Sequence, residues 1–350
     1  MITLGKVGRT AFDDLFGGKF GLESNAVLQG PTFGVDTSIV QISEELVLVV
    51  ASDPASFIPA LGVKESAWLT VALTANDIAT SGYLPKYAQV VLNLTHKITN
   101  EELTEYWNYI HQFCTEIGVS ITGGHTGFAD VGASTLAGGV TMFAVAENDH
   151  VKCSSFALPH QDLILTKTAA LSSAAILAKS FPNHTKQHLG NKAYEDLAAS
   201  FYQTSIVPEV KVLKNMPNIM QNISAMHDVT EGGSLGAIYE LCEAGGVGVK
   251  VNVDAIHVDE NQRAICNLFE IDPLRSVGAG SLLIACEKSV SERILNEFNN
   301  NAIQASIVGE TLPVDEGKTI VSRSGEDEFK YWNVDPYWAA FFDAVENGLS

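Results

Sequence analysis

Hydrophobic positions along this chain follow two periodicities, and the change from one to the other marks the expected elements. The apolar run 46–50 predicts a strand that brings Asp53 just past its end. In the segment 66–81, small and apolar residues recur at steps of three and four, which predicts a helix with one buried face. Asn76 and Asp77 lie beside that face. A charge there is costly unless a metal, a donor or a ligand meets it, although such an Asp can also point at water or at a backbone donor.

The first half of the chain continues with further strands and a well-marked helix. Thr99 and Glu102 have the spacing of a capping box, and Gly118 ends the helix that they begin. Its buried stripe is predicted to contain Leu103, Trp107, Ile110, Cys114 and Ile117. A short helix is expected over 9–16, and strands over 38–42, 87–94, 120–122 and 135–146.

The pattern breaks near residues 148–158, where we place a domain boundary. The expected domains are therefore 1–150 and 151–350, in a two-domain α+β architecture. The second half is predicted to contain strands over 162–166, 247–253, 281–286 and 305–309, and helices over 171–180, 192–202, 234–244, 260–269, 290–298 and 337–346.

Composition narrows the possible partners. A formal charge of -20 argues against nucleic acid or an anionic membrane, and it means that a polyphosphate ligand needs cations or local donors. The five cysteines are widely spaced and lie mostly in apolar runs, which indicates reduced core thiols and a cytoplasmic protein. No window approaches the length of a membrane span.

Four aspartates are candidates for metal binding: Asp36, Asp53, Asp77 and Asp228. Each lies in a loop or at the end or interior of an element rich in Gly, Asn or Thr. Hard carboxylate oxygens held in this way suit Mg²⁺ that bridges the phosphates of a nucleotide. Spacing alone does not separate such a site from scattered surface acids.

Two glycine pairs add candidate backbone donors. The segment 123–127, GGHTG, predicts a turn that an anion can approach, with His125 either acting as a base or bonding to the turn. Gly232 and Gly233 begin a helix, whose first amides have no partner within the helix. Neither the GxxxxGK[ST] pattern nor GxGxxG after a strand is present, so P-loop and Rossmann interpretations are weak.

The ordered segments GVDTSIV, ASDPASF, TANDIATSGYLPKY, GGHTG, HDVTEGG and GAGSLLIA resemble the AIR synthase-related, PurM-like superfamily, and hydrogenase maturation protein HypE is its nearest branch. The resemblance implies an N-terminal α/β domain that forms a homodimeric β-barrel, a C-terminal α/β domain, and ATP with Mg²⁺ as cofactors. It implies catalytic roles for Asp77 and His125, and ATP-dependent activation of an amide, carboxyl or phosphate oxygen of an acceptor. The implied metal ligands are Asp36, Asp53, Asp77 and Asp228, and the implied nucleotide contacts are Asn76, Gly123, Gly124, Thr126, Thr230, Gly232 and Gly233.

Several departures leave the activity open. The chain ends in ENGLS, where HypE ends in a carrier cysteine, and its first cysteine is Cys114, whereas selenophosphate synthetase needs one near the N-terminus. Glu231 stands where HypE has Arg, and Val35 stands where thiamine-phosphate kinase usually has a second acid. The alternatives are a non-catalytic ATP-binding assembly factor and a phosphotransferase of the thiamine-monophosphate kinase type. The acceptor is an unidentified small molecule or protein.

Overall fold

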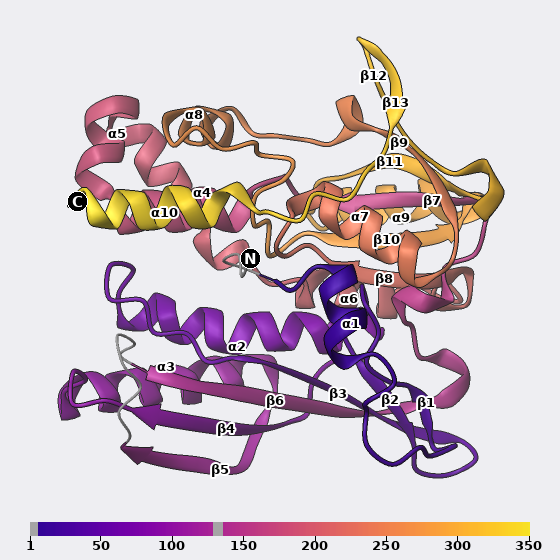
Figure 1. The fold of residues 1–350 in the computed structure, drawn as a ribbon, viewed down its shortest axis with the longest axis horizontal. Helices are drawn as coiled ribbons and strands as arrows, with labels where there is room; N and C mark the ends of the chain where they lie inside the picture. The colour runs from indigo at the N-terminus through magenta and orange to yellow at the C-terminus, as the bar shows by residue number, and fades with distance from the viewer. Residues whose placement is uncertain (1–5, 129–135) are drawn as a thin grey trace.

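The strands form two separate sheets, which confirms the expected α+β class (Figure 1). The structure is a computed structural model and describes residues 6–128 and 136–350. The first sheet has the order β1-β2-β3-β6-β4-β5, and the second has the order β13-β12-β9-β11-β7-β10-β8. Their bounds are β1 Val27–Gln29, β2 Ser38–Gln41, β3 Leu46–Pro54, β4 Tyr87–Leu94, β5 Ser120–Phe128, β6 Leu136–Glu147, β7 Gln161–Thr166, β8 Ile223–Asp228, β9 Gly248–Asn252, β10 Leu282–Glu287, β11 Ala305–Leu312, β12 Lys318–Ser322 and β13 Gly325–Glu328.

Ten helices accompany the sheets in the described part of the chain. None of them is both long enough and apolar enough to cross a membrane. Their bounds are α1 Arg9–Phe16, α2 Val63–Thr80, α3 Asn100–Ile117, α4 Leu171–Ser180, α5 Pro182–Ser200, α6 Val207–Asn215, α7 Gly233–Ala244, α8 Glu260–Leu268, α9 Lys288–Asn300 and α10 Pro336–Glu346.

Helix α2 lies between the two domains (Figure 1). It contacts β3, β6 and α3 of the first domain, and β8 and α6 of the second. The sequence predicts one buried face, but residues around most of the helix are buried, including Leu69, Asn76 and Ile78. The second domain accounts for the difference, because it covers the side that would face water in an isolated first domain.

Helix α3 confirms its predicted start and end. Thr99 and Glu102 form both bonds of the capping box, and Gly118 adopts the left-handed conformation at the C-cap. The predicted buried stripe is partly wrong: Trp107 is 38% exposed, while Tyr106 and Phe113 are buried.

The predicted GGHTG turn is wrong. Residues 120–128 form the continuous edge strand β5, which pairs in parallel with β4. Gly124 has φ +146°, and a Cβ added there would lie 1.8 Å from the carbonyl oxygen of Val90. The glycine is therefore needed for close approach of two strands in the presence of a bulge near Ala88.

Asn76 joins the two domains through its side-chain amide. The Nδ2 group donates to the carbonyl oxygen of Thr204 at 3.0 Å, and Oδ1 accepts from the amide of Ile206 at 2.9 Å. Asn76 is fully buried, so both backbone partners depend on it for a hydrogen bond. Trp68 on the same helix adds a 2.8 Å bond from Nε1 to Thr204 Oγ1.

We expect Asn76→Ala to lower the free energy of unfolding by about 2–5 kcal/mol, because it leaves two backbone groups buried without partners. Urea unfolding of the variant measures this loss. Asn108→Ala, at an exposed position of α3, is the matched control and should change stability by less than about 0.5 kcal/mol. An Asn76→Ala protein as stable as the wild type would contradict the role of Asn76 as a domain clamp.

Candidate functional site

A cavity of about 1030 Å³ lies between the domains. One part of its wall is acidic and contains all four candidate aspartates. The rest is largely apolar, with side chains from the 57–60 loop, α2, α4 and α10, among them Phe57, Leu73, Ile176 and Phe341. Such a combination of a charged end and an apolar chamber is typical of sites for small molecules.

The four aspartates come from separate elements that meet at this boundary. Asp36 precedes β2, Asp53 lies at the end of β3, Asp77 lies in the last turns of α2, and Asp228 ends β8. Three of them therefore belong to the first domain and one to the second. Because α2 and β8 are packed together, the fold itself brings these carboxylates to one cavity.

A charged network borders the aspartates. His227 Nδ1 lies 2.8 Å from Asp36 Oδ2, and His227 Nε2 lies 3.5 Å from Glu240 Oε2. Glu240 also forms an ion pair with Lys6 Nζ at 2.7 Å and accepts a 2.8 Å bond from the Tyr331 hydroxyl. With acceptors facing both ring nitrogens, His227 is placed as an imidazolium.

The pKa shifts within this network follow from burial and charge. Burial alone would lower the pKa of His227, but Asp36 and Glu240 outweigh it and raise the pKa to about 10. Burial alone would raise the pKa of Glu240, but Lys6 and His227 outweigh it and lower the pKa to about 2. His227, Lys6 and Glu240 are therefore all charged near neutral pH.

The pKa values of three aspartates that line the cavity are raised, whereas that of Glu240 is lowered. Burial raises the pKa of Asp53 to about 6, against the opposing charge of Lys6. Burial, with the charge of Asp36, raises the pKa of Asp228 to about 8. Burial and then the neighbouring aspartates, Asp228 first, raise the pKa of Asp77 well above its usual range. The protein alone therefore supplies too little positive charge to keep all of these carboxyls ionised together, whereas a bound cation would favour their ionised form.

These residues fit a divalent cation held jointly with a ligand. Asp228 is 1% exposed, and its Oδ2 atom is buried without a hydrogen-bond partner. No group of three or more His, Cys, Asp or Glu side chains in the described ranges is close enough to hold a metal ion by itself. Mg²⁺ commonly takes one or two carboxylates and completes its shell with water and phosphate oxygens, which is the arrangement that this donor set allows.

The structure confirms the predicted helix α7, but the backbone amides at its start already donate to other groups of the protein. The amide of Gly232 donates to Asp335 Oδ2 at 2.8 Å, and that of Gly233 donates to the carbonyl oxygen of Thr230 at 3.2 Å. The amide of Leu235 donates to the carbonyl oxygen of Leu274. Thr230 itself lines the cavity.

Other predicted site residues lie elsewhere in the single chain. Asn76 uses both ends of its amide on the backbone of the second domain. Gly123, Gly124, His125 and Thr126 are exposed residues of the edge strand β5, and the described lining of the cavity does not include them. The contribution of His125 and its neighbours to the site stays a prediction.

Four residues of the site were not predicted from the sequence: Lys6, His227, Glu240 and Asp335. The polar pair His227 and Asp228 at the end of β8 was visible within HDVTEGG, although the strand before it was not recognised. The order Asp335, Pro336 is typical of a helix N-cap followed by proline at N1, and Asp335 does cap α10. The partnerships of Lys6 and Glu240 join positions 234 residues apart, and no local pattern marks them.

The two-sheet α+β fold, with carboxylates gathered at the domain boundary, belongs to the PurM-like class of proteins. Residues 34–146 match the AIR synthase related protein, N-terminal domain, and residues 159–322 match its C-terminal domain. The chain belongs to the AIR synthase related family.

Similar proteins include ATP-linked enzymes. The chain is 25% identical over 251 residues to carbamoyl dehydratase HypE of Escherichia coli (strain K12), with 70% of this chain and 69% of that protein covered. A hydrogenase maturation protein HypE solved in complex with ATP has a TM-score of 0.69 at 19% identity, covering 93% of this chain and 92% of that one. AaThiL complexed with AMPPCP and TMP has a TM-score of 0.69 at 17% identity, covering 95% and 98%.

We expect Glu240→Gln to lower the free energy of unfolding near pH 7 by an amount on the order of 3 kcal/mol, because it removes the charge that offsets Lys6 and His227. The folded-state pKa of Glu240, about 2, lies below its usual value of 4.5. The stabilisation is therefore complete above about pH 4.5 and is lost as the pH falls toward 2. Urea unfolding of both proteins at pH 7 and pH 3 measures the change.

The matched control for this substitution is Glu243→Gln on the same helix. Glu243 pairs with Arg9 and Lys318 but is 24% exposed, so its loss should cost less than about 1 kcal/mol. A difference between Glu240→Gln and the wild type that is the same at both pH values would contradict the electrostatic explanation.

Proposed function

We propose that this protein is an Mg²⁺- and ATP-dependent enzyme that activates an amide, carboxyl or phosphate oxygen of an acceptor. The observation that carries the proposal is the convergence of Asp36, Asp53, Asp77 and Asp228 on one cavity, where the protein supplies too few cations to ionise them all. The family match and the nucleotide-bound structures of similar proteins support ATP as the ligand.

The acidic and apolar parts of the cavity would have different roles. Asp53, Asp77 and Asp228 would supply one or two carboxylates to each Mg²⁺, with phosphate oxygens completing its shell, and Asp36 would lie beside them, paired with His227. Bound Mg²⁺ offsets the charge that develops on a transferred phosphoryl group. The apolar chamber would exclude water and position the acceptor oxygen for attack on phosphorus.

The cysteines argue against a carrier role for a thiol of this chain. All five are buried and free, and burial raises the pKa of Cys114, Cys242 and Cys266 to about 12. The last of the five, Cys286, is fully buried in β10. None of these five thiols is therefore the proposed acceptor, and an ATP-binding assembly factor without turnover is the alternative.

We also propose that the protein forms a homodimer through its first sheet. Strand β5 is an edge strand, and Tyr87, Val91 and Val145 expose apolar side chains on the same sheet. A second copy that covers this surface would also change the surroundings of His125, which lies on β5.

We expect Mg²⁺ with ATP to raise the melting temperature of the purified protein, and ATP with a chelator to raise it much less, because a ligand that binds the folded state alone stabilises it. Asp77→Asn should remove most of the Mg²⁺-dependent shift without lowering the melting temperature of the ligand-free protein. Differential scanning fluorimetry measures both. Asp149→Asn, at an exposed position, is the control and should keep the full shift.

An equal shift with and without Mg²⁺, or a full shift in Asp77→Asn, would contradict the metal-dependent site. ADP release measured with an added acceptor then separates the two functions. Turnover supports the enzyme, and binding without turnover supports the assembly factor.

A further inference from the structure

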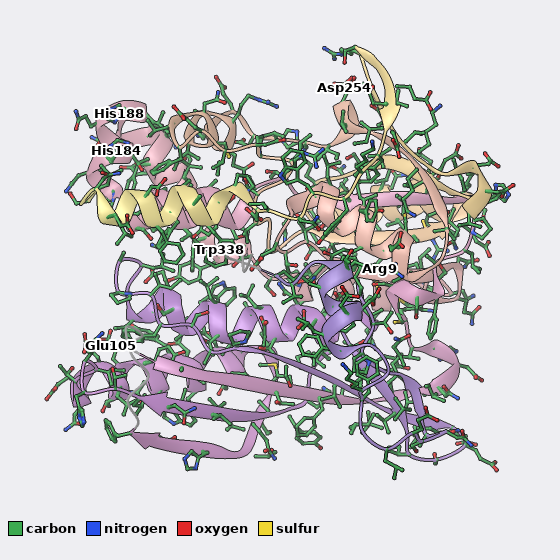
Figure 2. The ribbon with its side chains drawn as sticks, in the orientation of Figure 1. Arg9, Glu105, His184, His188, Asp254 and Trp338 are labelled. Atoms are coloured by element: carbon green, nitrogen blue, oxygen red, sulfur yellow. The ribbon has the colours of Figure 1, made fainter. Side chains whose placement is uncertain are left out.

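The apolar chamber of the cavity has a strongly aromatic wall. Helix α10 lies beside α4 and across the gap from α2, and Trp338 is on the side of α10 toward α2 (Figures 1 and 2). The aromatic side chains of the lining are Phe57 from the 57–60 loop and Tyr337, Trp338, Phe341 and Phe342 from α10. A wall of this kind binds a ligand through apolar contact and ring stacking.

Packing within the second domain holds this aromatic wall in place. Tyr337 and Phe341 are 2% and 6% exposed, and they belong to a hydrophobic cluster that α10 shares with α4 and α8. Trp338 and Phe342 lie one turn apart on α10, and their rings are stacked, with centroids 6.1 Å apart and an angle of 21° between the planes. The chamber is therefore formed before a ligand enters it.

Positive charge is scarce in the same wall. Lys6 is the single basic residue of the described lining, and its Nζ atom already lies 2.7 Å from Glu240 Oε2. The other charged side chains of the lining are acids: Asp36, Asp53, Asp77, Asp228 and Glu231. A carboxylate, sulfonate or phosphate that entered the apolar chamber would therefore be buried without a cation, which is costly. Mg²⁺ can offset such a charge at the acidic end alone.

The size of the cavity leaves room for two ligands. Its volume of about 1030 Å³ lies at the upper limit of the range of roughly 300–1,000 Å³ that is usual for the site of one small molecule. A nucleotide at the acidic end and a second small molecule in the apolar chamber can therefore bind together.

We propose that the acceptor is a small molecule whose non-reacting body is apolar or aromatic and has no anionic group. Its reacting oxygen lies at the acidic end, and its body packs in the apolar chamber against Trp338 and Phe342. Both residues lie beyond residue 322, outside the two matched domains, so they are specificity-determining positions that the matched core does not supply. This inference rests on the proposed function for the identity of the ligand as an acceptor.

Two fluorescent probes that differ by one anionic group test the chamber without a nucleotide. N-phenylnaphthylamine is neutral, and anilinonaphthalenesulfonate has the same rings with a sulfonate. Titration of each probe into the wild-type protein should give a dissociation constant about tenfold lower for the neutral probe, because the sulfonate would be buried without a cation. Equal affinities, or tighter binding of the sulfonate probe, would overturn the proposal.

A cation added to the wall should change this preference. Phe342 is 41% exposed, so Phe342→Lys can place an ammonium group beside the chamber while part of the side chain stays in water. The preference for the neutral probe over the sulfonate probe should fall by about tenfold in this variant. Ala339→Lys adds the same charge at an exposed position of α10 outside the described lining, and it should keep the wild-type preference. The same preference in both lysine variants would overturn the assignment of the probe to the chamber.

Addition of Mg²⁺-ATP to the wild-type protein with bound probe shows whether the nucleotide base uses the same space. The neutral probe should stay bound at saturating Mg²⁺-ATP, because the two ligands lie in different parts of the cavity. Displacement of the probe by Mg²⁺-ATP, but not by Mg²⁺-tripolyphosphate, would assign the apolar chamber to the adenine base and overturn the proposal. This measurement needs no substitution, so it also decides the matter if Phe342→Lys does not fold.

A failure of the proposed function looks different. In that case the protein does not bind Mg²⁺-ATP, whereas the two probes and the two lysine variants, which need no nucleotide, still decide on the class of ligand that the apolar chamber takes. Preference for the neutral probe that Phe342→Lys alone reduces supports an apolar ligand without an anionic group, and any other pattern overturns it.

Discussion

The packing of helix α2 between the two domains is the constraint on which the rest of the structure depends. The helix contacts β3 and β6 on one side and β8 and α6 on the other, so it has no face free for water along most of its length. This position places Asp77 opposite Asp228 across the domain boundary, and it lets Asn76 bond to the backbone of the second domain. A relative movement of the domains would therefore break the buried hydrogen bonds of Asn76 and separate the aspartates of the cavity wall at the same time.

Charge is distributed over this boundary in two layers. In the first layer, His227, Glu240 and the cavity-lining Lys6 offset one another's charge, and their pKa values shift so that each stays charged. At the cavity, burial shifts the pKa values of Asp53, Asp77 and Asp228 upward because no equivalent partner exists among the described residues. The first layer therefore fixes Asp36, and the carboxyls of the second need a bound cation in order to be ionised together.

The sequence predicted those features that depend on neighbouring residues. The capping box of α3, the glycine start of α7 and the strands that deliver Asp36 and Asp53 have local signals, and the structure contains all of them. The GGHTG segment was misread because glycines that permit close approach of strands and glycines that bind an anion have the same local pattern. Three sets of bonds were beyond such reasoning: those of Asn76 to Thr204 and Ile206, of Glu240 to Lys6 and Tyr331, and of Asp335 to Gly232. Each of these partners lies about 90 or more residues away in the sequence.

Both ends of the chain contribute to the cavity, although both lie outside the matched family domains. Lys6 comes from the N-terminal segment, and the apolar chamber takes its outer wall from α10. The N-terminal segment and α10 thus add to a cavity wall that α2 also forms, and a substitution at Lys6 or at the exposed Phe342 would alter the chemical character of the chamber while leaving both sheets in place.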